Sequence, residues 1–275
     1  MTTSPTITLN NGVQIPQLGF GVYQISTDDI VPALTKAVEV GYRHIDTAAL
    51  YGNEEGVGRV VRQSGIARED FFVTTKCWNS DQGYDEALGA FDASLERLGL
   101  DYVDLYLIHW PQPKRDRYVD TWRAFEKISA DGRARAIGVS NFQADHLRRL
   151  VDEGTVVPAV NQVEAHPTFA QTELRAVHQE LGIATEAWAP LGKSEDLDNP
   201  TVTSIAERVG KTPAQVVLRW HLQLGNIVFP KSVTPERIQA NFDVFDFELS
   251  ASDVAEIDAV DAGNRMGPDP DAFNS

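Results

Sequence analysis

The stretch VDLYLIHWPQPKRDRYVDTWRAFEKISADGRARAIGVSN, residues 103–141, has the pattern of one strand–helix–strand unit. Its two ends, residues 103–110 and 134–141, are apolar runs too continuous for a sheet with one face in water. Between them, residues 118–130 place apolar side chains three and four positions apart, which is typical of a helix with one buried face. The unit therefore predicts two parallel strands, buried on both sides and joined by a covering helix.

The same alternation repeats along the chain. Strands are predicted at residues 18–22, 43–48, 71–76, 103–110, 134–141, 158–165, 183–190 and 226–232. Helices are predicted at residues 28–40, 54–63, 85–98, 118–130, 144–151, 172–181, 213–223 and 235–242. No linker divides these units, so we expect one domain, residues 1–275, with an α/β fold of the (β/α)8 TIM barrel type. The turn at residues 10–12 predicts a short N-terminal β-hairpin that caps the barrel bottom.

Composition and charge restrict the partners. The 275 residues include 24 basic and 40 acidic side chains, a net charge of −16, which repels nucleic-acid phosphates and anionic membranes. The single cysteine, Cys77, allows no intrachain disulfide, and we expect no metal site. The start of the chain lacks the features of a signal peptide, so the cytoplasm is the expected compartment. We also expect a monomer, because no coiled-coil pattern or long apolar patch is apparent.

Polar side chains gather at the C-terminal ends of the predicted strands. Asp46 ends the second strand, Lys76 the third and His109 the fourth. In barrels of this kind the active site lies at that edge. Lys76 interrupts an apolar segment, and a buried ammonium needs a partner, for which Asp46 is the natural candidate. Tyr51 follows the second strand closely enough to reach the same space, so we predict that these four groups form one catalytic cluster.

Four motifs resemble those of the aldo-keto reductase superfamily. They are GYRHIDTAxxYGNE (residues 41–54), VDLYLIHWP (103–111), GVSNF (138–142) and FPKSVTPERI (229–238). The resemblance extends from the hairpin to about residue 261 and is most similar to the bacterial 2,5-diketo-D-gluconate reductase branch. That closer likeness rests on the segments IPQLG (15–19), YGNEEGVG (51–58), KTPAQVVLRWHLQ (211–223) and NFDVFDFEL (241–249). It implies reduction of aldehyde or ketone carbonyls to alcohols with NADPH.

The resemblance also implies a role for each member of the cluster. Tyr51 would donate a proton to the alkoxide that forms as hydride reaches the carbonyl carbon. Lys76 would lower the pKa of Tyr51 from its ordinary value near ~10, and Asp46 would hold Lys76 in place. His109, expected as a neutral imidazole, would orient the carbonyl oxygen.

A cofactor site for NADPH follows from the same resemblance. The nicotinamide carboxamide would meet Ser140, Asn141 and Gln162, and its ring would stack on Trp188, where many relatives carry tyrosine. A basic, hydroxyl-bearing tract would bind the adenosine 2′-phosphate and favour NADPH over NADH. The predicted cofactor-binding residues are Ser140, Asn141, Gln162, Trp188, Pro190, Leu191, Lys231, Ser232, Val233, Arg237 and Asn241.

Three departures from the family pattern concern this cofactor site. Ala240 stands where relatives often carry a longer polar residue, so one adenine contact is expected to be missing. Thr234 replaces a basic residue of some relatives, which would loosen the preference for the phosphate. Residues 190–200 are shorter than the loop that covers the cofactor in many relatives, and this predicts faster cofactor release.

Aromatic side chains are expected to line the substrate pocket. We expect Tyr23, Trp78 and Trp110 to line it together with His109, whereas Phe20 is assigned to the core and Cys77 has no role. The polar tail, residues 264–275, would help to set specificity. Diketogluconate, methylglyoxal-like dicarbonyls, β-keto esters and simple aldehydes all stay open as the small-molecule substrate.

Two other functions are compatible with a barrel of this kind. One is a non-enzymatic binding protein, which the full catalytic cluster argues against. The other is an isomerase or lyase that uses Lys76 as a Schiff-base nucleophile; the neighbouring Asp46 would keep that amine charged and unreactive.

Overall fold

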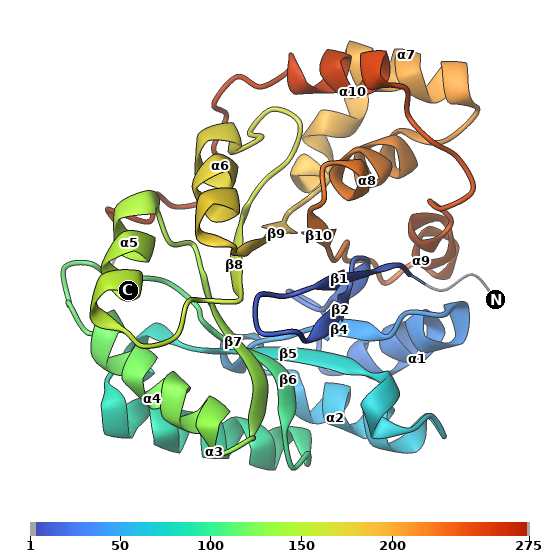
Figure 1. Ribbon diagram of the computed structural model, residues 1–275. Coiled ribbons are helices and arrows are strands. Elements are labelled where there is room, and N and C mark those ends of the chain that lie inside the picture. Colours follow the sequence, from blue (N-terminus) through green and yellow to red (C-terminus); the bar gives the residue numbers. More distant parts are fainter. Residues whose placement is uncertain (1–3, 274–275) are drawn as a thin grey trace.

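A ring of parallel strands forms the centre of the computed structural model, which describes residues 4–273 (Figure 1). A parallel bridge between Leu18 and Val228 closes the ring, and the Val228 amide donates to the Gln17 carbonyl at 2.9 Å. The strands of the ring pair in chain order and are β3 (Gly19–Gly21), β4 (His44–Asp46), β5 (Phe72–Cys77), β6 (Val103–Ile108), β7 (Ala134–Ser140), β8 (Val160–Glu164), β9 (Ala184–Trp188) and β10 (Ile227–Val228). The predicted (β/α)8 TIM barrel is confirmed.

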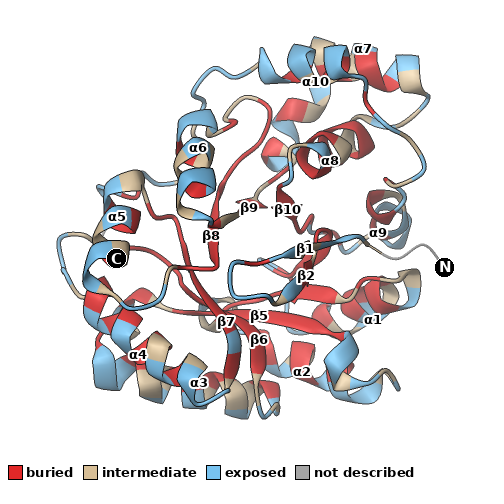
Figure 2. Ribbon diagram, viewed as in Figure 1, coloured by how far each residue is buried: buried red, intermediate tan, exposed pale blue. Residues whose placement is uncertain are grey.

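Helices surround the ring and bury one face each, while nearly all residues of the ring strands are buried (Figure 2). The α-helices are α1 (Ile30–Val40), α2 (Glu54–Gln63), α3 (Tyr84–Leu98), α4 (Tyr118–Ala130), α5 (Ala144–Glu153), α6 (Thr172–Leu181), α7 (Pro200–Val209), α8 (Pro213–Gln223), α9 (Pro235–Phe242) and α10 (Ala251–Asp258). Short 3-10 helices are η1 (Ala49–Tyr51), η2 (Arg68–Asp70), η3 (Asn79–Asp81) and η4 (Gly192–Asp198).

Two helices were not expected from the sequence. Helix α7 begins after Asn199, whose side chain accepts from the Thr201 amide, and α10 begins at a capping box formed by Ser250 and Asp253. Both pack on the buried Trp220 of α8 in a cluster apart from the main core. They lie outside the strand–helix alternation, which is why the repeating pattern did not indicate them.

The eighth strand is shorter than predicted. Only Ile227–Val228 pair as a strand, although the apolar pattern extends over residues 226–232. Pro230 has no backbone N–H with which to continue a ladder. The chain beyond Val228 therefore leaves the sheet at the edge where the functional residues gather.

The N-terminal hairpin closes the opposite end of the barrel. Strands β1 (Thr6–Thr8) and β2 (Gln14–Pro16) pair antiparallel, and Leu9 and Ile15 pack against Phe72 and Ile227 near the starts of β5 and β10. The predicted hairpin cap is thus present. Within residues 4–273, no helix has both the length and the hydropathy needed to span a bilayer.

Candidate active site

A cavity of about 530 Å³ opens at the C-terminal edge of the strands. Asp46, Tyr51 and His109 line it, and Lys76 lies fully buried beside them. Asp46 and Lys76 come from the neighbouring strands β4 and β5, Tyr51 from η1, and His109 follows β6. The barrel therefore brings the four predicted groups to one place.

Lys76 holds the cluster together. Its Nζ donates to Asp46 Oδ1 at 2.7 Å and to the Thr47 carbonyl at 2.9 Å, and it lies 3.4 Å from the Tyr51 hydroxyl. Burial disfavours the ammonium, but the facing Asp46 and Tyr51 outweigh it, so the pKa of Lys76 is raised above its ordinary value. A charged amine is a poor nucleophile, which argues against Schiff-base chemistry.

Tyr51 is more acidic with Lys76 beside it than it would be alone, yet burial decides the balance. Burial raises the pKa of Tyr51 to about 12, although the Lys76 ammonium acts in the opposite direction. Lys76 therefore acts on this pKa in the expected direction, but burial outweighs its charge and the pKa of Tyr51 lies above its ordinary value. The phenol is fully protonated at neutral pH and holds a proton that it can donate.

His109 is a neutral imidazole. Burial, and then the charge of Lys76, hold the pKa of His109 well below its usual range. Its Nδ1 is buried and has no hydrogen-bond partner among the described residues. The ring meets Tyr51 edge-on at 5.8 Å and Trp78 at 5.0 Å between centroids. A polar, uncharged group thus faces the cavity between two aromatic rings.

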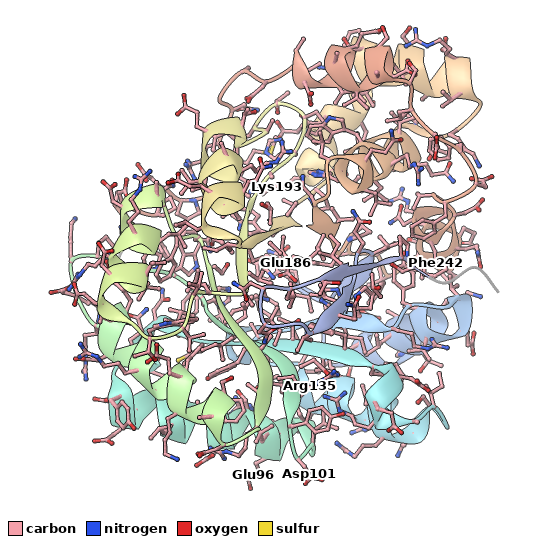
Figure 3. The ribbon with its side chains drawn as sticks, viewed as in Figure 1. Glu96, Asp101, Arg135, Glu186, Lys193 and Phe242 are labelled. Atoms are coloured by element: carbon pink, nitrogen blue, oxygen red, sulfur yellow. The ribbon has the colours of Figure 1, made fainter. Side chains whose placement is uncertain are left out.

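Glu186 extends the cluster and was not singled out in the sequence. Gln162 Nε2 donates to both Asp46 Oδ2 and Glu186 Oε2 at 2.8 Å, so one amide bridges two carboxyl groups. Glu186 is fully buried and lies near the middle of the barrel (Figure 3). Burial, reinforced by Asp46, raises the pKa of Glu186 to about 8. A glutamate inside the apolar run of residues 183–190 was the available signal.

Replacing Glu186 by glutamine is expected to remove a pH dependence of stability. The pKa of Glu186 is about 8 in the fold against 4.5 ordinarily, so the folded state binds the proton more tightly and the wild type loses stability as pH rises from 4.5 to 8. The Glu186→Gln variant keeps the bridge to Gln162 without a titrating group. Urea unfolding from pH 5 to 9 should show the variant gaining about 2 kcal/mol or more on the wild type. The exposed Glu180→Gln is the control, and parallel profiles for Glu186→Gln and wild type would contradict the assignment.

The predicted cofactor residues fall into two groups. Ser140, Asn141, Gln162, Trp188, Pro190 and Lys231 line the cavity. The second group lies outside the cavity lining, on the chain that follows β9 and β10, and comprises Leu191, Ser232, Val233, Arg237 and Asn241. Arg237 is exposed in the first turn of α9, whereas Asn241 is buried in its last turn.

Asn141 connects three strands at the cavity wall. Its Nδ2 donates to the His109 carbonyl at 3.0 Å, and its Oδ1 accepts from Trp188 Nε1 at 2.8 Å. The residue has a φ of 64°, in the left-handed region that asparagine tolerates better than most side chains. This geometry fixes the indole of Trp188 at the cavity.

The aromatic residues predicted for the substrate pocket line the cavity, as Tyr23, Trp78 and Trp110 do, whereas Phe20 is buried in the core against Tyr42. The sequence did not indicate the other lining side chains individually. Leu50, Lys193, Met266 and Phe273 are among these additional lining residues. Cys77 is buried on the far side of β5, with its thiol directed at the backbone carbonyls of Trp78 and Asp81.

The model of the aldo/keto reductase family matches residues 17–262, nearly the whole barrel. The chain belongs to the aldo/keto reductase family. An aldo-keto reductase of Mycolicibacterium smegmatis is 59% identical over 98% of both chains, and a glyoxal reductase of Bacillus subtilis is 52% identical over 97% of this chain and 96% of its own. A Gox0644 variant, whose crystal structure contains NADPH, is 45% identical in sequence to this chain. The structural match covers 99% of both chains and has a TM-score of 0.95.

Proposed function

We propose that the protein is an NADPH-dependent reductase that converts aldehyde or ketone carbonyls to alcohols, with Tyr51 as the proton donor. One observation carries this proposal: a protonated tyrosine hydroxyl lies 3.4 Å from a buried ammonium, beside a neutral histidine, at the cavity. One barrel supplies all of these groups, so residues 1–275 are proposed to act as a single domain and as a monomer.

The cavity suits a nicotinamide cofactor. Gln162 uses its Nε2 on Asp46 and Glu186, which leaves its Oε1 to accept from a carboxamide N–H. The Trp188 ring offers a flat face, and Lys231 and Arg237 supply positive charge on an acidic protein. When bound there, NADPH supplies the hydride.

The protein's own residues would then manage the charge on the carbonyl oxygen. His109 is neutral, so it orients that oxygen by a hydrogen bond and leaves the proton transfer to Tyr51. Tyr51 transfers its hydroxyl proton to the oxygen as the alkoxide forms. The Lys76 ammonium stabilises the phenolate that remains, because the two groups are close in a buried setting. Asp46 holds Lys76 in position.

The cavity wall around Tyr51 favours small dicarbonyl compounds as substrates. Tyr23, Leu50, Trp78, Trp110 and Phe273 form an aromatic and apolar surface there. The cavity lining offers a carboxylate such as that of diketogluconate two cations, Lys193 and Lys231. Lys193 Nζ donates to the Met266 carbonyl at 3.1 Å and Lys231 is proposed to hold the cofactor, so the carboxylate would have to share one of them. The similarity to a glyoxal reductase supports the same choice. Keto-sugar acids of the 2,5-diketo-D-gluconate type are the second candidate.

The test is an NADPH-consumption screen over four carbonyl classes: methylglyoxal-like dicarbonyls, diketogluconate, β-keto esters and simple aldehydes. We expect turnover, with the highest kcat/KM for the dicarbonyls. NADPH binding without turnover of any class would instead support a non-enzymatic binding protein. Borohydride trapping of a substrate adduct on Lys76 would support Schiff-base chemistry.

The cofactor arm of this screen uses Arg237→Ala. A guanidinium that pairs with the 2′-phosphate contributes a charge-assisted interaction, so its loss should raise the KM for NADPH by about 10- to 100-fold and leave that for NADH unchanged. Arg148→Ala, on the exposed side of α5, is the matched control. Equal losses for both cofactors would refute the assignment of the 2′-phosphate to Arg237.

A further inference from the structure

The C-terminal segment is held over the cavity by a buried carboxylate that the proposed mechanism does not use. Glu164, at the end of β8, is 1% exposed. Its Oε1 accepts from the Met266 amide at 2.6 Å and its Oε2 from the Gly267 amide at 2.8 Å. Met266 and Gly267 line the cavity. One side chain of the barrel thus seats two successive backbone amides of the tail.

Glu164 is also joined to the other segment that borders the cavity. His166 Nε2 lies 3.2 Å from Glu164 Oε1, and His166 Nδ1 lies 2.8 Å from Asp196 Oδ2. Burial disfavours the imidazolium, but the two carboxylates outweigh burial and raise the pKa of His166 to about 9. The histidine is therefore charged at neutral pH and bridges two negative groups. Asp196 belongs to η4, the 3-10 helix that follows β9.

The two segments also touch directly. Lys193 of η4 donates from Nζ to the Met266 carbonyl. At Gly267, a Cβ atom would lie 2.4 Å from Trp188 Cη2, so only glycine lets the tail come this close to the indole. The described part of the tail runs from α10 past α6 to the side of α5, where Asp271 pairs with His146, and this places it across the barrel rim (Figure 1).

Thr168 provides a second connection between Asp196 and the tail, in addition to the one through His166 and Glu164. Thr168 Oγ1 donates to Asp196 Oδ1 at 2.8 Å, and the Thr168 carbonyl accepts from the amides of Ala262 and Asn264 at 3.1 and 3.0 Å. Asp196 is thus connected to the tail by two routes, one through His166 and Glu164 and the other through Thr168.

We propose that Glu164 and Asp196, joined through His166, are positioning residues that hold the tail (residues 264–273) and the η4 segment (residues 190–198) as one unit over the cavity. In terms of the proposed function, on which this part rests, the tail borders the carbonyl substrate and the η4 segment borders the cofactor. Movement of one segment away from the cavity then weakens the hydrogen bonds that hold the other segment there. The η4 segment is short, and in this proposal the ion bridge between Asp196, His166 and Glu164 holds it over the cavity.

Hydrogen exchange of the Met266 and Gly267 amides tests the coupling without any turnover. In full-length Asp196→Asn, the carboxamide no longer stabilises the His166 cation, and Glu164 loses a positive partner. We expect both amides to exchange about tenfold faster or more than in the wild type. A change of this size corresponds to the free energy of one charge-assisted hydrogen bond. Asp198→Asn is the matched control, because Asp198 is exposed in the same segment. Unchanged exchange in Asp196→Asn, or equal acceleration in both variants, would overturn the proposal.

The reciprocal measurement uses Glu164→Gln, which removes the charge of the side chain that accepts from the two tail amides. We expect the rate of NADP+ release in rapid-mixing experiments to rise about threefold or more, and the KM for the carbonyl to rise about tenfold with kcat maintained or increased. An effect on KM with unchanged NADP+ release would refute the coupling. If Asp196→Asn does not fold, this measurement decides alone. The hydrogen-exchange measurement does not depend on turnover. Failure of the carbonyl screen would therefore contradict the proposed function without contradicting the coupling of the two segments.

Discussion

Replacing Tyr51 by phenylalanine is expected to lower kcat for carbonyl reduction by about 10³-fold while the Kd for NADPH changes by less than about twofold. General-acid catalysis by a positioned side chain is worth about 10²- to 10⁴-fold, and Tyr51 is the proton-bearing group next to Lys76. Phenylalanine keeps the ring that packs against Tyr23 at 5.0 Å between centroids, so the cavity shape persists. Single-turnover rates and a fluorescence titration with NADPH separate the chemical step from binding.

Tyr23→Phe is the matched control for this experiment. It removes a second phenol at the same cavity, but Tyr23 is 53% exposed and no hydrogen bond joins it to Lys76 in the described chain. We expect its kcat to stay within about threefold of the wild type. Activity retained in Tyr51→Phe, or an equal loss in the two variants, would remove Tyr51 as the acid.

Replacing Lys76 by methionine is expected to lower kcat by about 10²-fold or more, because the phenolate left by Tyr51 then forms without a neighbouring positive charge. The variant should also lose about 3–5 kcal/mol of stability, since Asp46 is left buried without its ion-pair partner. A loss of stability could mimic a loss of catalysis. The free energy of unfolding therefore has to be measured together with kcat.

The double variant Asp46→Asn, Lys76→Met separates the two effects. It removes both charges of the buried pair, so we expect most of the stability to return. Catalysis should not return, because the ammonium beside Tyr51 is still missing. Recovery of kcat along with stability would show that Lys76 acts only by supporting the fold. A defect confined to KM would equally count against its effect on the proton transfer.

Much of the fold could be predicted because its signals are local. The predicted ranges 54–63, 118–130, 172–181, 213–223 and 235–242 coincide with α2, α4, α6, α8 and α9. Each of these helices buries one apolar face, and the sequence shows that face as apolar residues three and four positions apart. Helices α7 and α10 were missed because they lie outside the repeating unit and pack on α8 rather than on the barrel core.

The candidate site was predictable where the barrel rule applies. Residues at the ends of neighbouring strands must meet at one edge, so Asp46, Lys76 and His109 could be grouped from the sequence. The rule says nothing about which additional buried polar groups join them. Glu186 lies two residues before Trp188 in the chain, yet its link to Asp46 passes through Gln162, which is 116 residues from Asp46.

The sequence by itself determined the barrel, the family resemblance and the grouping of Asp46, Tyr51, Lys76 and His109. Only the tertiary structure decided the protonation state of these groups and the hydrogen bonds between Glu164 and the tail. The pKa of Tyr51 is raised rather than lowered, because burial in three dimensions outweighs the charge of Lys76. Glu164 meets the Met266 amide across 102 residues of chain. Periodicity reports neighbours along the chain, whereas desolvation and long-range hydrogen bonds depend on distances that exist only after folding.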